Sequence, residues 1–253
     1  MTTVKVRNVE IGTGMPKICV PIVEKTREDI LAAAGKIKAA AADLIEWRVD
    51  WFEEVEDVTA TMHVAGELRA ILGDCPLLFT FRTAREGGER VIHTEDYVKL
   101  NLAAARSGYV DLIDLELETK KKSLKALVSD VQKESVKVIL SNHDFEKTPE
   151  KEEIRERLCK MQELGADILK IAITPQSKLD VLKLLAVTEE VSRVHVECPI
   201  ITMSMGGAGV ISRISGEIFG SAVTFGAVDK ISAPGQLKVE YLKTILKILH
   251  ENK

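Results

Sequence analysis

Short apolar runs recur along the whole chain at a nearly regular interval. Each run is rich in Val, Ile, Leu or Phe, a composition that favours β-strands. The runs cover residues 17–22, 44–48, 77–81, 112–116, 137–142, 168–173, 200–203 and 223–225. Their starts lie 23 to 35 residues apart, which suits one strand plus the helix that returns the chain to a parallel neighbour. The pattern therefore predicts eight strand–helix units.

The segments between these runs have the composition and spacing of helices. Residues 27–41 are rich in Ala, Lys, Ile and Leu, and residues 150–164 place apolar side chains on one helical face. Residues 94–107 and 237–250 are predicted as helices on the same grounds.

Eight such units predict a closed (β/α)8 barrel, also called a TIM barrel. An open doubly wound sheet shares the alternation, but the number of units and the nearly continuous apolar strands favour the barrel. The first strand is also not followed by the GxGxxG motif of dinucleotide-binding sheets. Residues 4–11 precede the first unit and predict a short β-hairpin that closes the barrel bottom. Without a long Pro/Gly/Ser linker, residues 1–253 are predicted to form a single domain.

Charge and composition exclude several classes of function. The chain has 35 Lys and Arg against 39 Asp and Glu, so it lacks the basic excess expected for binding nucleic acid or an anionic membrane. No apolar run approaches the length of a membrane span, and the first seven residues do not form a signal peptide. Four cysteines without CxxC spacing indicate reduced thiols and a cytoplasmic protein.

Charged residues gather where the predicted strands end. Active sites of (β/α)8 barrels lie at the carboxyl ends of the strands, and charged groups are seldom buried there without a partner or a function. The candidates from these ends and the loops after them are Glu46, Arg48, Arg82, Glu86, Asp114, Glu116, His143 and Lys170.

Lys170 interrupts the apolar strand 168–173, and two interpretations are open for it. It forms a structural ion pair with a strand-end carboxylate such as Glu116 or Glu46, or burial keeps its amine partly neutral. A neutral amine can attack a ketone or aldehyde and form a Schiff base.

His143 is the one histidine of five at the carboxyl end of a predicted strand. Its strand and that of Lys170 are consecutive, and neighbouring strands lie about 4.8 Å apart. A base beside an imine-forming lysine could abstract a proton next to a carbonyl. Glu86, followed by two glycines, is either an exposed loop carboxylate or the group that orients the imidazole.

Further residues predict the walls of the site. Arg82 and Arg213, with Glu46, would form a polar mouth, because arginine binds carboxylates through two parallel hydrogen bonds. For Arg48 an ion pair within the mouth is favoured over ligand contact. Met203 and Phe225 are either apolar walls of the site or core residues.

Two loops complete the predicted mouth. The Gly-rich loop 205–209 serves either as a plain turn or as a phosphate-binding loop, a frequent arrangement after the seventh strand of barrels. Residues 232–236, which include Ser232 and Gln236, could close as a lid over a hydroxylated ligand.

These residues stand within motifs that resemble the type I 3-dehydroquinate dehydratase family over nearly the whole chain. The matching segments are 45–50 (IEWRVD), 77–82 (LLFTFR), 86–89 (EGGE), 141–145 (SNHDF), 164–167 (LGAD), 170–172 (KIA), 201–205 (ITMSM), 209–213 (GVISR), 224–226 (TFG) and 232–236 (SAPGQ). The resemblance implies a barrel that dehydrates 3-dehydroquinate to 3-dehydroshikimate in the shikimate pathway of aromatic amino acid biosynthesis.

The resemblance also implies roles for individual residues. Lys170 would form the imine with the C3 ketone, and His143, paired with Glu86, would take the C2 proton and protonate the departing C1 hydroxyl. Arg213 would clamp the substrate carboxylate. The residues that would hold ring hydroxyls or the carboxylate are Glu46, Arg48, Arg82, Ser232 and Gln236. No metal or diffusible cofactor is implied, and a homodimer is expected.

The sequence departs from some relatives at three places, and two other functions also fit part of the pattern. Pro21 stands where some relatives have a substrate-contacting serine, Leu169 stands where proline is frequent, and residues 206–208 are small. A Schiff-base aldolase acting on a phosphorylated sugar would also use Lys170, but it leaves Glu86, His143 and the predicted lid unexplained. A barrel that only binds a small acid would need none of the three reactive groups.

Overall fold

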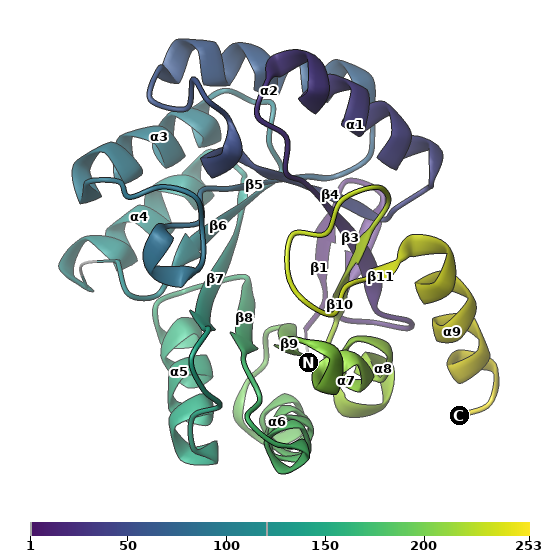
Figure 1. Ribbon diagram of the computed structural model, residues 1–253. Helices are drawn as coiled ribbons and strands as arrows, with labels where there is room; N and C mark the ends of the chain where they lie inside the picture. Colours follow the sequence, from purple (N-terminus) through teal and green to yellow (C-terminus); the bar gives the residue numbers. More distant parts are fainter. Residues whose placement is uncertain (1, 120) are drawn as a thin grey trace.

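The computed structural model describes residues 2–119 and 121–253, and its main sheet is a parallel, curled one (Figure 1). Its strand order is β11-β10-β3-β4-β5-β6-β7-β8-β9. The strands are β3 (Lys17–Ile22), β4 (Leu44–Arg48), β5 (Leu77–Thr80), β6 (Leu112–Glu116), β7 (Lys137–Asp144), β8 (Ile168–Ile173), β9 (Ile200–Ser204), β10 (Val223–Ala227) and β11 (Leu237–Lys238).

Strands β3 to β10 are the eight predicted strands, and they close into a barrel. The two ends of the curled sheet meet through a parallel bridge between Ile200 and Ser221. The Ala222 amide donates a hydrogen bond of 2.8 Å to the Ile200 carbonyl and thus joins the segment before β10 to β9. The (β/α)8 prediction is therefore confirmed, with β11 as an added short strand beside β10.

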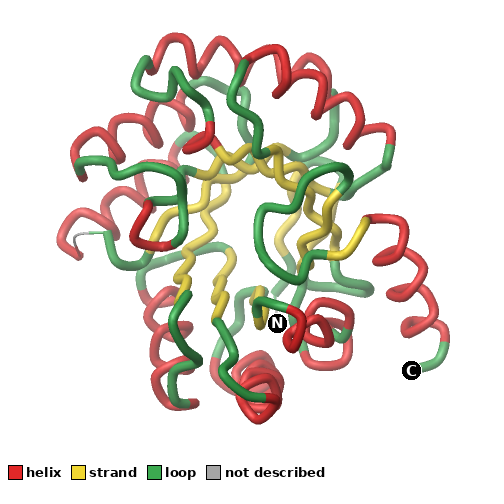
Figure 2. The backbone as a smooth tube through the Cα atoms, in the orientation of Figure 1, coloured by secondary structure: helices red, strands yellow, loops and turns green. Residues whose placement is uncertain are grey.

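Helices surround this inner ring of strands, as Figure 2 shows. The α-helices are α1 (Arg27–Ala39), α2 (Val58–Leu72), α3 (Thr94–Arg106), α4 (Lys121–Lys133), α5 (Lys151–Glu163), α6 (Lys178–Glu190), α7 (Val210–Ile214), α8 (Gly216–Phe219) and α9 (Val239–Glu251). Shorter helical turns are η1 (Val49–Trp51), η2 (Ala84–Glu86), η3 (Val191–His195) and η4 (Gly207–Gly209).

Side-chain alternation along the strands produces two separate apolar layers. In β4, Ile45 and Trp47 point outward and pack with the helices in one core cluster. Leu44 of the same strand belongs to a second cluster inside the barrel, together with Leu78 and Leu112. Since successive side chains of a strand face opposite sides, Glu46 and Arg48 must also point inward, above Leu44. The alternation of side chains along β4 thus places the charged residues Glu46 and Arg48 at one end of the barrel interior.

A hairpin of β1 (Val4–Val6) and β2 (Val9–Ile11) covers the other end of the barrel. Its residues Val4, Val6 and Ile11 belong to the interior cluster that includes Leu44 and Leu78. This contact confirms the predicted hairpin across the barrel bottom.

The aspartates that precede β4, β6 and β8 each accept a hydrogen bond from a backbone amide at the start of the preceding strand in the chain. The Asp43 carboxylate accepts a hydrogen bond of 2.8 Å from the Ile18 amide. Asp111 accepts one from Leu77, and Asp167 one from Val138. These bonds satisfy amides at the strand starts that would otherwise lack a partner, and they hold the register between neighbouring units.

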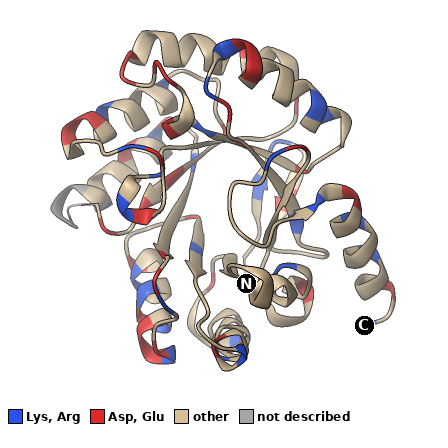
Figure 3. Ribbon diagram, viewed as in Figure 1, with Lys and Arg blue, Asp and Glu red and all other residues tan. Residues whose placement is uncertain are grey.

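The outer surface carries both signs of charge. Lys and Arg are interspersed with Asp and Glu along the outer helices (Figure 3). In residues 2–119 and 121–253, none of the helices combines the length and the apolar character that crossing a bilayer requires.

Candidate active site

A cavity of about 50 Å³ lies at the carboxyl ends of the strands. Of the residues given catalytic or substrate-binding roles from the sequence, it brings together all except Arg213, and the further candidates Asp114 and Glu116 do not line it. Its lining consists of Glu46, Arg48, Arg82, Glu86, Gly87, His143, Phe145, Lys170, Ala172, Met203, Met205, Phe225, Ser232, Ala233 and Gln236.

Lys170 reaches this cavity from the middle of β8. It is 3% exposed, and its Nζ donates a hydrogen bond of 3.0 Å to Oδ2 of Asp114. Glu46 Oε1 lies 3.8 Å from the same nitrogen, and the Phe225 ring centroid lies 4.5 Å away. The ion-pair interpretation named Glu116 or Glu46 as partner. Glu46 lies within ion-pair distance, but the nearer carboxylate belongs to Asp114 and not to Glu116.

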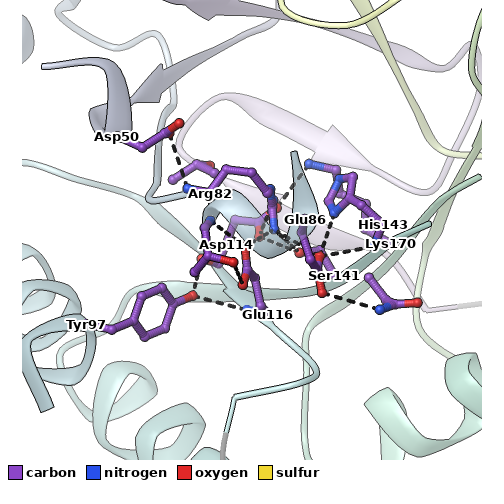
Figure 4. A network of polar contacts seen from close by, with 12 residues as sticks. Asp50, Arg82, Glu86, Tyr97, Asp114, Glu116, Ser141, His143 and Lys170 are labelled. Atoms are coloured by element: carbon purple, nitrogen blue, oxygen red, sulfur yellow. Dashed lines mark hydrogen bonds and ion pairs between the residues drawn. The ribbon is translucent and has the colours of Figure 1, made fainter. Parts of the chain in front are cut away.

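Asp114 is fully buried and belongs to a network of charges that Figure 4 shows. Arg82 donates a hydrogen bond of 2.7 Å to Asp114 Oδ1 and another of 3.1 Å to Glu116. Ser141 accepts a bond of 3.0 Å from Arg82 and donates one of 2.5 Å to Asp114. Although burial favours the neutral acid, the charges of Arg82 and Lys170 hold the pKa of Asp114 well below its usual range.

The strand period explains why these groups meet. Asp114 and Glu116 are two residues apart in β6 and therefore share the inward face. In β7 and β8 the register places Ser141 beside Lys170. The sequence-based prediction overlooked Asp114 as a partner of the lysine, and its period-two spacing from Glu116 was the signal that identifies it.

His143 is held by Glu86, which η2 presents from the loop after β5. Its Nδ1 lies 2.9 Å from Glu86 Oε2, and its backbone amide donates a bond of 3.0 Å to the same oxygen. Asn142 donates a bond of 3.3 Å to Oε1. With Nδ1 engaged, Nε2 is the ring nitrogen available to a ligand.

Burial changes the titration of this pair. It raises the pKa of Glu86 to about 8. Burial, together with the positive charges of Arg82 and Lys170, lowers the pKa of His143 well below its usual range. Two groups this close titrate as a unit.

Glu46 and Arg48 occupy inward positions of β4. Arg48 donates hydrogen bonds of 2.8 Å to both oxygens of Asp50, which is the ion pair favoured for it from the sequence. Glu46 accepts a bond of 2.9 Å from Thr80 and pairs in register with Pro21 of β3. Asp50 was not singled out from the sequence, although it stands two residues after β4 within the segment 45–50.

Arg213 of α7 lies just behind the cavity wall and is 2% exposed. Its NH2 group donates a bond of 2.9 Å to the Pro234 carbonyl, and its NH1 group lies 3.9 Å from the sulfur of Met203. Its Nε has no hydrogen-bond partner among the described residues. Burial alone lowers the pKa of Arg213 to about 10, because no carboxylate among the described residues offsets its positive charge. A bound anion would supply this partner.

The loop 228–236 lies over the cavity mouth. Besides the bond from Arg213, Pro234 accepts one of 3.1 Å from the Gly206 amide. Gly235 has φ +82°, and a Cβ there would lie 2.5 Å from the Gly206 carbonyl oxygen, so glycine is required for this close approach. The Gln236 amide donates to the Ser232 hydroxyl at 2.8 Å. Both polar side chains of the predicted lid therefore line the cavity as one unit.

The cavity combines a primary amine and an imidazole–carboxylate pair with an apolar wall of Met203 and Phe225. Behind this wall lies the Arg213 guanidinium, which has no carboxylate partner among the described residues. An amine and a base in one enclosed cavity can form an imine with a ketone and remove a proton beside it. Elsewhere in the described ranges as well as here, no group of three His, Cys, Asp or Glu side chains is placed to hold a metal ion.

Comparison with known proteins bears directly on this site. A model of the family described as type I 3-dehydroquinase matches residues 18–253. The 3-dehydroquinate dehydratase of Clostridioides difficile (strain 630) is 53% identical over 249 residues, covering 98% of both chains. That of Salmonella agona (strain SL483) is 54% identical over 251 residues, covering 99% of this chain and 100% of the relative.

Solved structures agree with these relatives. Type I 3-dehydroquinate dehydratase from Clostridium difficile superposes with a TM-score of 0.97 at 52% identity, covering 100% of this chain and 99% of the other. The Geobacillus kaustophilus enzyme gives a TM-score of 0.97 at 39% identity, covering 100% and 98%. The 3-keto-L-gulonate-6-phosphate decarboxylase of Vibrio cholerae, at 13% identity and a TM-score of 0.60, shares the fold alone.

The family match covers Glu86 in the loop after β5 and the strands that supply His143 and Lys170, and the identity to the named relatives extends over the full barrel. The chain belongs to the type I 3-dehydroquinase family.

Proposed function

We propose that this chain dehydrates 3-dehydroquinate to 3-dehydroshikimate through an imine on Lys170, acting as a single-domain barrel. The observation that carries the proposal is that the buried Lys170 amine and the His143–Glu86 pair line one small cavity. The reaction is the one named for the relatives from Clostridioides difficile and Salmonella agona.

The chemistry follows from the two reactive groups. Lys170 Nζ, after losing a proton, attacks the C3 ketone, and water leaves to give a protonated imine. His143 Nε2 removes the C2 proton, and the electron pair of the C–H bond moves into the imine as an enamine forms. The enamine expels the C1 hydroxyl, which takes a proton from His143 and leaves as water. Hydrolysis of the remaining imine releases the product and restores Lys170.

The other polar residues would bind the substrate. The unpaired guanidinium of Arg213 supports binding of the substrate carboxylate, because a buried cation favours a charged partner. Ser232, Gln236 and Glu46 line the cavity and would contact ring hydroxyls. Arg82 and Arg48 also line it, but their guanidinium groups already serve Asp114, Glu116 and Asp50, so they act first by holding those carboxylates.

A related structure supports covalent chemistry in a relative. The Clostridium difficile enzyme was crystallised with covalently modified comenic acid. The sugar-phosphate aldolase suggested as an alternative has no comparable support, since the sugar-phosphate enzymes among the similar structures share the fold alone.

Borohydride reduction with 3-dehydroquinate tests the proposal. We expect irreversible inactivation, with the mass of the reduced adduct on the peptide that contains Lys170. Lys170→Ala should abolish trapping while binding persists. His143→Ala should still form the imine but lose turnover by about 10²- to 10⁴-fold, the usual contribution of a general acid–base.

Each alternative function gives a different result in this experiment. An adduct formed only with a sugar phosphate would favour the aldolase, and no adduct with either compound would favour a binding protein. Near-normal turnover by His143→Ala would contradict the assignment of the base.

The assembly and setting are part of the same proposal. We infer a cytoplasmic homodimer that serves the shikimate pathway of aromatic amino acid biosynthesis. The outward apolar residues Leu179 and Leu182 on α6, Ile211 on α7 and Ile218 on α8 support self-association over this face, since large exposed apolar patches commonly mark interfaces. Sedimentation equilibrium of the protein should give twice the chain mass, and a monomer at micromolar concentration would contradict the dimer.

A further inference from the structure

Asp114 is the carboxylate nearest to the reacting nitrogen among the described residues. Its Oδ2 lies 3.0 Å from Lys170 Nζ, compared with 3.8 Å for Glu46. Asp114 is 0% exposed, and Lys170 is 3% exposed. Bulk solvent therefore screens the attraction between this carboxylate and a positive charge on that nitrogen only weakly.

The positive charge on the nitrogen is the same before and after the imine forms. An ammonium group and a ketone give a protonated imine and one water, so the nitrogen loses two hydrogens to the leaving water and keeps one. The neutral amine exists only transiently between these two cations. A single fixed anion beside Nζ can thus serve both states without moving.

From this geometry, and resting on the imine chemistry proposed above, we propose that Asp114 is the counter-ion of the protonated imine on Lys170. It contacts the reacting nitrogen directly and keeps the proton on the imine, so that the imine remains an effective electron sink.

The surroundings of Asp114 fit this role better than those of Glu46. Arg82 and Ser141 both donate to Asp114 Oδ1, which leaves Oδ2 directed at Lys170. Asp114 also stands between the two cations, with Arg82 on one oxygen and Lys170 on the other. Without its charge, the imine cation would face Arg82 in a buried site, where solvent screens charges only weakly.

Several other titratable groups face this pair and must be considered in any pH dependence. They come from β3, β4, β6, β7, α3 and the loop after β5, and they are Cys19, Glu46, Arg82, Glu86, Tyr97, Glu116 and His143. Glu116 is the useful control, because it binds the same Arg82 but does not contact Lys170.

Trapping with cyanoborohydride over pH 6 to 9 tests the proposal, because this reagent reduces the protonated imine. The unsubstituted enzyme, Asp114→Asn and Glu116→Gln are incubated with 3-dehydroquinate, and intact-mass spectra give the initial rate of adduct formation. An opposite charge in close contact shifts a titration by roughly 1–3 pH units. Between pH 6 and pH 9, the trapping rate of Asp114→Asn should therefore fall at least about 10-fold more than the trapping rate of the unsubstituted enzyme. The trapping rate of Glu116→Gln should change with pH as that of the unsubstituted enzyme does.

The outcomes separate this inference from the proposed function. A pH dependence of Asp114→Asn that matches the unsubstituted enzyme would overturn the counter-ion role. Absence of any adduct in the unsubstituted enzyme would instead overturn the imine chemistry itself.

A second measurement needs no substitution, in case Asp114→Asn does not fold. With ¹⁵N-labelled lysine in the unsubstituted enzyme, the imine nitrogen should keep its bonded proton, seen as one-bond ¹⁵N–¹H coupling, up to pH 9. A crystal structure of the trapped adduct should retain the carboxylate of Asp114 within about 3.2 Å of the nitrogen. Loss of the coupling below pH 8, or a carboxylate turned away, would contradict the proposal.

Discussion

Replacement of Glu86 by Gln tests how the His143–Glu86 pair is charged. In the base-competent state the carboxylate is ionised and accepts the Nδ1 proton of a neutral imidazole, which leaves the Nε2 lone pair free. One additional proton, placed on either partner, removes this state. Because burial raises the pKa of Glu86 to about 8, kcat/KM should rise with pH as that proton leaves. At pH 7 it should be about one-tenth of its alkaline plateau.

Glu86→Gln removes the carboxyl that shares this proton. His143 then titrates alone, and its pKa is lowered by burial and by Arg82 and Lys170. The imidazole stays neutral across the neutral range, so the acid limb of kcat/KM should move to lower pH. The plateau itself should fall by about 10- to 100-fold, a loss typical of removing a carboxylate that orients a functional histidine.

The assay is the ultraviolet absorbance of the conjugated enone product, recorded from pH 5.5 to 9.5. Glu89→Gln is the matched control, because it removes one negative charge from the same loop, and Glu89 lies three residues beyond Glu86. Its profile should equal that of the unsubstituted enzyme. An acid limb that stays in place in Glu86→Gln would refute the assignment of the shared proton.

Three further substitutions probe the rest of the structure. Arg82→Met leaves the buried carboxylates of Asp114 and Glu116 without their cation, so urea unfolding at pH 7 should show a loss of about 3–5 kcal/mol; a loss below 1 kcal/mol would contradict the described network. Ile11→Ala removes a fully buried side chain at the barrel bottom and should lower the free energy of unfolding by about 2–5 kcal/mol, with kcat and KM unchanged. An altered kcat would show that the hairpin acts on the site. Arg213→Lys loses the planar fork and should raise KM by roughly 10- to 100-fold, equivalent to about 1.5–3 kcal/mol, with a smaller effect on kcat; an unchanged KM would exclude the carboxylate contact.

Much of the barrel could be predicted because its signals are local. The eight apolar runs match the eight barrel strands within a few residues, since a strand of a parallel sheet buried on both faces is apolar throughout. Lys170 and His143 stood out for the same reason, as polar residues in or directly after such runs.

The partner of Lys170 could not be predicted in the same way. The contact Lys170–Asp114 joins residues 56 positions apart. Which of two inward carboxylates of β6 meets the lysine depends on the register and stagger between β6, β7 and β8. A local sequence pattern does not contain that stagger. The sequence alone therefore could not distinguish Glu116 from Asp114 as the partner of Lys170.

By itself, the sequence determined the repeat of strands and helices and the identity of the reactive groups, because periodicity and residue chemistry are properties of short segments. Only the tertiary structure decided that Asp114 rather than Glu116 receives Lys170. It also placed Arg213 against Pro234 of the loop after β10. These choices follow from closing a staggered sheet into a barrel, which sets distances between side chains that no single segment contains.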